Sequence, residues 1–208
     1  MNETNTKIPA LIFIYPEAFS DEKIKEDLED IQANNFDLQI LKRDSGAFAS
    51  FEWIIPTAFG AYILKPYFDS FLSEAGKDHY TFLKKGLTKL IDKGKKYKLS
   101  LITSDQTPDK LSKTYSQSLV VSIDFQTIDG RHLRMLFDNN LAFSDWQNGL
   151  DQVLTLFEAN YTSFPDDILT HELERLKIKQ HRMVYVIINA DTKELEFRDD
   201  SKMFEKYK

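Results

Sequence analysis

The stretch LVVSIDFQTIDGRHLRMLF, residues 119–137, alternates apolar and polar side chains on both sides of Asp129-Gly130. Successive side chains of a strand point to opposite faces, so this alternation predicts two antiparallel strands joined by a tight turn. A three-residue loop at 128–130 gives one wholly apolar face, made by the pairs Val121 with Phe137, Ile123 with Met135, and Phe125 with Leu133. It also gives Gly130 the left-handed position of a bulged loop, which glycine tolerates best.

The opposite face of this hairpin is predicted to be polar and in contact with water. The same register sets Asp124 opposite Arg134 and His132 opposite Gln126, and opposite charges at facing positions attract each other. A two-residue turn would instead place Phe125 opposite Arg134 and mix the two faces. We therefore expect the three-residue loop.

A second hairpin is predicted over residues 184–199. A four-residue loop at 190–193 gives the pairs Ile188 with Leu195, Val186 with Phe197, Ile187 with Glu196, and Tyr185 with Arg198. This pattern is typical of antiparallel strands with one face in water. Two helices are expected between the hairpins, the first capped by Ser144 and the second beginning at Pro165.

A strand–helix–strand unit is predicted at the start of the chain. Residues 10–15 form an apolar run that suits a buried strand, and Ser20 can cap the helix that follows. One face of this helix is apolar, through Ile24, Leu28 and Ile31. A second strand is expected over 36–41, and the length of the unit suits a right-handed crossover between parallel strands.

Residues 48–72 are rich in aromatic side chains, namely Phe48, Phe51, Trp53, Phe59, Tyr62, Tyr67, Phe68 and Phe71. Proline breaks a helix interior but suits its first turn, so Pro56 and Pro66 predict two or three short helices here. Charged residues and prolines leave about a dozen uncharged residues in a row, too few to span a bilayer. We expect these rings in the core, and contact with a partner or with lipid is the alternative.

A basic helix follows this aromatic stretch. Residues 84–98 contain seven lysines and one aspartate, whereas the whole chain has a net charge of −6. On a helix beginning at Asp78 and ending near Gly94, one side is apolar and another is lined by Lys85, Lys89, Lys93 and Lys96. Such a helix suits an anionic surface or an acidic protein partner, so these four lysines are the candidate binding residues. A solvated helix face is the alternative, and the absence of arginine among the lysines makes nucleic acid a poorer match.

Composition limits the class of protein and its compartment. The 208-residue chain is 42% apolar and 13% aromatic, enough to bury a sizeable core. It has no cysteine, which excludes disulfides, thiolate zinc sites and a cysteine nucleophile. One lysine precedes the apolar run at 8–15 and acidic residues follow it, so this run is interpreted as a strand and not as a signal peptide. We expect a soluble, cytoplasmic protein with no transmembrane segment.

The polar segment 104–118 is the best place for a boundary between parts of the chain. One interpretation is a single compact domain over residues 1–208. The other is two abutting halves, 1–104 and 119–208, joined by 105–118. The sequence leaves both open.

No strong catalytic signature is present: the chain lacks a P-loop, a GxGxxG fingerprint, a GxSxG elbow and an HExxH helix. His171 and Glu174 have the spacing to share a helix face and ligate a metal, but the surrounding charges indicate a solvated face. Asp124 and Asp138 are candidates for paired carboxylates in acid–base catalysis, although Arg134 opposite Asp124 favours an ion pair. We therefore assign no catalytic residue, metal ligand or cofactor.

These patterns predict an α+β protein: a mixed sheet with an N-terminal βαβ unit, an aromatic-rich helical cluster and two C-terminal β-hairpins. We expect a noncatalytic binding or interaction module whose aromatic helices and basic helix form the contact surface. A small carboxylate-dependent hydrolase and a peripheral membrane accessory protein are the alternatives.

Overall fold

A computed structural model describes residues 10–33, 37–43, 57–71, 76–96, 117–179 and 182–199. The first half contributes β1 (Leu11–Pro16), α1 (Asp21–Ala33), β2 (Leu38–Arg43), β3 (Phe59–Ile63), α2 (Lys65–Phe71) and α3 (Gly76–Lys96). The second half contributes β4 (Gln117–Gln126), β5 (His132–Asp138), α5 (Phe143–Ser163), α6 (Ile168–Arg175), β6 (Val184–Ile188) and β7 (Leu195–Asp199). The fold is α+β, as the sequence predicts.

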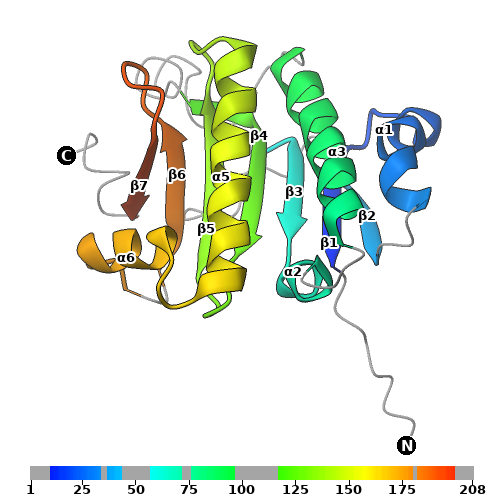
Figure 1. Cartoon of the computed structure of the whole chain (residues 1–208). Coiled ribbons are helices and arrows are strands. Elements are labelled where there is room, and N and C mark those ends of the chain that lie inside the picture. Colours follow the sequence, from blue (N-terminus) through cyan, green and yellow to red (C-terminus); the bar gives the residue numbers. More distant parts are fainter. Residues whose placement is uncertain are drawn as a thin grey trace, which may run out of the picture.

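The strands form one mixed sheet in the order β2-β1-β3-β4-β5-β6-β7 (Figure 1). Three neighbouring pairs are parallel, namely β1 with β2, β3 with β4, and β5 with β6. The other three are antiparallel, namely β1 with β3, β4 with β5, and β6 with β7. The sheet therefore ends at β2 on one side and at β7 on the other.

The described helices pack on one face of this sheet. α1 contacts α3, α3 contacts α5, α5 contacts α6, and α2 contacts both α3 and α5. This face carries the main hydrophobic core, in which Phe13, Ile123 and Val186 are fully buried. Phe125 of β4 stacks on Phe157 of α5 with their ring centroids 4.5 Å apart. The core thus lies between a layer of helices and one sheet face.

One of the two helical crossover connections between parallel strands is left-handed, which is the rarer handedness. The connections β1–α1–β2 and β5–α5–α6–β6 pass over the same face and start from strands that run in the same direction. They step toward opposite edges of the sheet, so their hands must differ. Figure 1 shows the first as a right-handed crossover and the second as a left-handed one. A right-handed connection, the form that nearly all such units take, would have placed α5 and α6 on the other face.

The second hairpin has the predicted register, and the first has it from Ser122 to Gln126. A register shift lies between Gln117 and Ser122, and the predicted pair of Val121 with Phe137 is not among the observed pairs. In the first, Ile123 pairs with Met135 and Asp124 with Arg134, and Gly130 has a φ of 85°. In the second, the four predicted pairs are all present, from Ile188 with Leu195 to Tyr185 with Arg198. The period of two in the sequence was sufficient to set the register of these pairs.

The prediction that the polar face of the first hairpin meets water is confirmed for His132, which is exposed, and is wrong for Asp124 and Arg134. Asp124 and Arg134 are only 7% and 4% exposed. On the same face, Leu136, Tyr185 and Ile187 form a second buried cluster. Alternation identifies the side chains that share a face, but it does not show whether that face is shielded from water.

The prediction of short helices throughout residues 48–72 needs a correction. Phe59–Ile63 is strand β3, which pairs with β1 and β4 on its two sides. A short apolar run on a buried strand cannot be told from a buried helix by periodicity alone. The helical part is α2, with Pro66 in its first turn as expected. Residues 48–56 and Leu72 lie outside the described part of the structure.

The prediction of a buried aromatic stretch is confirmed for three of the four rings whose burial the structure describes there, and Tyr62 is half-buried. Phe59, Tyr67 and Phe68 are at most 3% exposed. Phe68 also stacks on Tyr161 of α5, with a centroid distance of 4.3 Å, which ties α2 to the C-terminal helices. The possible boundary at 105–118 lies almost wholly outside the described ranges, so the division into halves stays a prediction.

Candidate functional site

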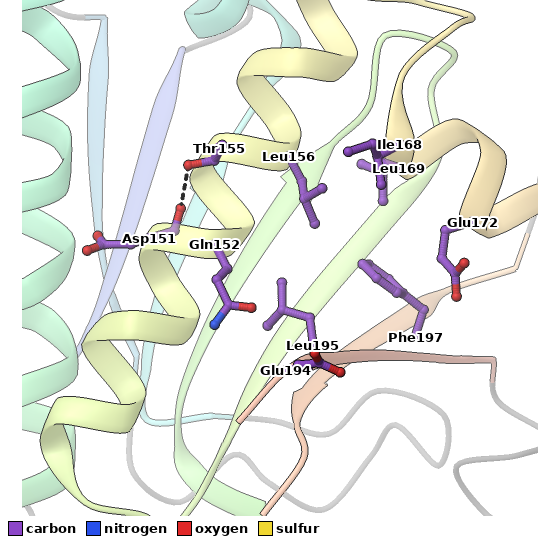
Figure 2. Close-up of a pocket in the computed structure, with 10 residues that line it drawn as sticks. All are labelled: Asp151, Gln152, Thr155, Leu156, Ile168, Leu169, Glu172, Glu194, Leu195 and Phe197. Carbon is purple, nitrogen blue, oxygen red and sulfur yellow. Dashed lines mark hydrogen bonds between the residues drawn. The ribbon is translucent and has the colours of Figure 1, made fainter. Parts of the chain in front are cut away.

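An open groove lies on the helical side of the sheet, between α5, α6 and the edge strand β7 (Figure 2). Its volume is about 550 Å³. Its lining consists of Asp151, Gln152, Thr155 and Leu156 of α5, Ile168, Leu169 and Glu172 of α6, and Glu194, Leu195 and Phe197 at β7. Two helices and a strand thus enclose it on three sides.

Apolar side chains form the floor of the groove. Leu195 and Phe197 are two residues apart on β7, so both point to the helical side of the sheet. Leu156 and Ile168 approach from the two helices (Figure 2). Ile168 is 71% exposed, which is unusual for a large aliphatic side chain beside other apolar groups. A patch of this kind with a polar rim is typical of an interaction surface.

A buried hydrogen-bond network fixes the α6 wall. Asp167 caps α6 by accepting a hydrogen bond from the Thr170 amide over 2.9 Å. Asn160 of α5 donates through Nδ2 to Asp167 Oδ2 and to Thr170 Oγ1, each over 3.1 Å. The backbone amide of Ile128 donates to Asn160 Oδ1 over 3.0 Å. Asn160 therefore joins α5, α6 and the first hairpin at one corner.

The turn before β7 is fastened to α5 at the other end of the groove. Gln152 Nε2 donates a hydrogen bond to the Lys193 carbonyl oxygen over 3.2 Å. Lys193 Nζ also lies 3.1 Å from Asp145 Oδ2. These contacts join the turn before β7 to α5.

The charged side chains that line the groove are all acidic. The Asp151 carboxylate points away from the groove in Figure 2 and lies 2.9 Å from Lys84 Nζ of α3. Glu172 accepts hydrogen bonds from Arg175 on the same helix, and these lower the pKa of Glu172. Glu194 is exposed. Glu172 and Glu194 are therefore the carboxylates on the side of the groove near α6 and β7, and Glu172 is paired with Arg175.

The four lysines predicted to bind a partner lie on α3, outside the groove. Lys89 Nζ donates to the Glu26 carbonyl oxygen of α1 over 3.2 Å, and Lys93 forms an ion pair with Asp27 of α1. Lys96 lies 2.6 Å from Asp92 of its own helix, and Lys85 is exposed. The structure thus places Lys89 and Lys93 at the contact between α1 and α3.

The two aspartates considered for catalysis are not brought together. Asp124 is paired with Arg134, and Asp138 lies four residues beyond Arg134 on β5, roughly 13 Å along the strand. Paired catalytic carboxylates of glycosidases lie about 5–10 Å apart. Asp138 instead accepts a hydrogen bond from the Asn140 amide over 2.8 Å, which is a turn contact.

The predicted His171 and Glu174 spacing leads to no metal centre in the structure. Both side chains are exposed on α6. No group of three His, Asp or Glu side chains within the described ranges is arranged to hold a metal ion.

The sequence did not predict the groove, although it contains a weak signal for it. Leu156 and Ile168 lie off the apolar stripes of their helices, which are formed by residues such as Val153 and Leu169. Apolar residues outside a stripe are often uncovered in the folded chain. Leu156 and Ile168 lie close together because of the path that the chain takes from α5 to α6, and no local sequence pattern encodes that path.

No protein-family model, curated protein or solved structure matches this chain. Among the helices that the structure describes, none has the length and apolar composition needed to cross a lipid bilayer.

Proposed function

We propose that this protein is a noncatalytic interaction module and that its groove binds a polypeptide segment of a partner protein. One observation carries the proposal: Ile168, 71% exposed, stands beside the half-buried Leu195 and Phe197 over an open volume of about 550 Å³. Removing apolar surface from water contributes about 25 cal/mol per Å². Covering these side chains is therefore favourable.

The rigidity of the walls supports binding of a defined segment. Asn160 fixes α6 against α5, and Gln152 fixes the turn before β7. A preformed groove loses little conformational entropy when a ligand enters, so more of the contact energy appears as affinity. Apolar anchors in such a groove, enclosed by polar groups, are typical of interface hot spots.

The basic helix remains a predicted second contact surface. Lys89, Lys93 and Lys96 contact carbonyl or carboxylate groups of this chain, so an acidic partner or an anionic membrane would have to replace these contacts. Binding in the groove requires no such replacement. The hydrolase hypothesis is weakened by the separation of Asp124 from Asp138, and the groove is the preferred surface.

The test is selection of peptides from a random displayed library on the immobilised full-length protein. We expect families of peptides that bind the wild type and do not bind Ile168→Asp. Aspartate in the first turn of α6 agrees with the helix dipole, so this variant should keep its fold. Circular dichroism and thermal unfolding check that expectation.

Leu41→Asp is the matched control. Leu41 is 40% exposed on β2, at the opposite edge of the sheet, and it receives the same change of side chain. Peptides selected on the wild type should bind Leu41→Asp with unchanged affinity. Failure to enrich any peptide sensitive to Ile168→Asp, in a folded variant, contradicts the proposed function.

A further inference from the structure

We propose that the segment that enters the groove is an amphipathic α-helix of a partner protein, with lysine or arginine on its polar side. This inference rests on the proposed function and names the chemistry of the partner. It follows from the place of the groove in the helical layer, from the direction of the floor side chains and from the sign of the charges at the rim.

The groove occupies the position that another helix of the layer would take. α1, α3 and α5 follow one another across the sheet (Figure 1), and neighbouring helices pack about 8–10 Å apart. β7 lies beyond α5, and α6 is only eight residues long. A helix placed over β7 would contact α5 through Leu156 and the sheet through Leu195 and Phe197.

An added strand fits these side chains less well than a helix. A strand would pair with β7 through backbone groups, in the plane of the sheet. Leu195 and Phe197 point out of that plane, and Leu156 and Ile168 reach the groove from helices above it. A ligand that covers all four must lie on the sheet and not beside it. A helix with apolar residues at i, i+3, i+4 and i+7 presents a matching ridge.

The rim selects the sign of charge on the helix. Asp151 faces Lys84 and Glu172 is paired with Arg175, so Glu194 is the most available carboxylate of the lining and Glu172 is the second. The hydrogen bonds from Arg175 lower the pKa of Glu172, which therefore stays ionised at neutral pH. Within the described residues, the Glu194 carboxylate forms no hydrogen bond or ion pair. Lysine or arginine on the helix would pair with these groups, and an acidic helix would be repelled.

The experiment is calorimetric titration of the full-length protein with a designed peptide. The probe has about 18 residues, because shorter isolated helices are only marginally stable. It contains leucine on one face and lysine and alanine on the other. One comparison peptide has the same composition with the leucines scattered around the helix. Another has glutamate in place of every lysine.

We expect the cationic amphipathic peptide to bind the wild type at least tenfold more tightly than either comparison peptide. Ile168→Asp should weaken its binding at least tenfold, and Leu41→Asp should leave it unchanged. The double variant Glu172→Gln, Glu194→Gln should weaken binding about fivefold at low salt, and less at high salt because ions screen exposed charges.

Equal binding of the scattered-leucine peptide, or of the glutamate peptide, overturns the inference. In that case library peptides sensitive to Ile168→Asp still support the proposed function, so the two failures are distinguishable.

Residues 200–208, which lie outside the described ranges, also carry lysines next to Met203, Phe204 and Tyr207. If the full-length triple variant Met203→Ser, Phe204→Ser, Tyr207→Ser binds the cationic peptide tenfold more tightly than the wild type, the groove belongs to the chain's own segment. That result would overturn the inference that a partner protein supplies the helix. A dimer abolished by Ile168→Asp would assign the groove to a second copy, with the same consequence.

Discussion

Arg134 Nε lies 2.7 Å from Asp124 Oδ1, and this ion pair joins β5 to β4 away from the main core. Both side chains are buried. Ser122 donates a hydrogen bond to Asp124 Oδ2 over 3.4 Å, and Arg134 Nη2 lies 3.4 Å from the Tyr62 hydroxyl. A slip of one residue between β4 and β5 would leave both charges unpaired in a buried site, so the pair reinforces the register.

Removing one partner of this pair should be costly. Arg134→Met leaves the Asp124 carboxylate buried without its counter-ion, and we expect a loss of about 3–5 kcal/mol in the free energy of unfolding. The double variant Asp124→Leu, Arg134→Met should lose much less, because no buried charge remains. Urea denaturation of the two single variants and the double variant measures the coupling. Additive losses would show that the two charges do not depend on each other.

The Tyr15 hydroxyl should contribute nothing to stability. It is buried and has no hydrogen-bond partner in the described structure. Tyr15→Phe removes an unsatisfied polar group, so the free energy of unfolding should stay the same or rise by about 1 kcal/mol. Tyr161→Phe is the control, since the Tyr161 hydroxyl donates to the Gln126 carbonyl oxygen over 2.7 Å. The free energy of unfolding of Tyr161→Phe should fall by about 1 kcal/mol. A larger fall for Tyr15→Phe would show that the Tyr15 hydroxyl does have a hydrogen-bond partner.

The close approach of α3 to β4 should make Gly94→Ala destabilising. A Cβ at this position would lie 2.8 Å from Val121 Cβ, which is attached directly to the β4 backbone and cannot move away. Overpacking of this kind costs about 1–3 kcal/mol, more than the helix propensity that alanine adds. Gly86→Ala on the same helix meets the flexible end of Ile31 and should be better tolerated. Equal thermal stability of the two variants would contradict the packing of α3 on β4.

Stability in acid should depend on Glu196. Burial raises the pKa of Glu196, but hydrogen bonds from Arg198 and Asn189 lower it more, so the pKa lies below its ordinary value. A carboxylate of lowered pKa stabilises the fold above its unfolded pKa of about 4.3, and this contribution is lost as the pH falls further. Glu196→Gln should therefore be less stable than the wild type at about pH 7, and the difference should shrink toward about pH 3. A difference that stays constant over this range would exclude the ionised carboxylate as its cause.

The hairpins were predictable because their registers follow from a local period of two. Ile123 with Met135 and Val186 with Phe197 are pairs that only one loop length produces on a single apolar face. Strand β3 was not predictable in this way. Its sequence, FGAYI, is a short apolar run, and its identity depends on pairing with β1 and β4 far along the chain.

The groove was beyond the reach of sequence patterns for a topological reason. A right-handed connection from β5 to β6 is the general expectation, and it would have placed α5 and α6 on the other face. The left-handed path brings Leu156 and Ile168 over Leu195 and Phe197. The apolar residues themselves were visible in the sequence, but their meeting depends on this path. The burial of Asp124 and Arg134 likewise depends on how the rest of the chain shields that face.

Hydrogen–deuterium exchange with and without the designed cationic helix locates its binding site directly. If the groove is the binding surface, amides of residues 168–172 in α6 and 195–199 in β7 will exchange more slowly with the peptide bound, and amides of 38–43 in β2 will not change. Protection confined to α3 around Lys85 and Lys96, or no protection at β7 under saturating peptide, would contradict binding in the groove.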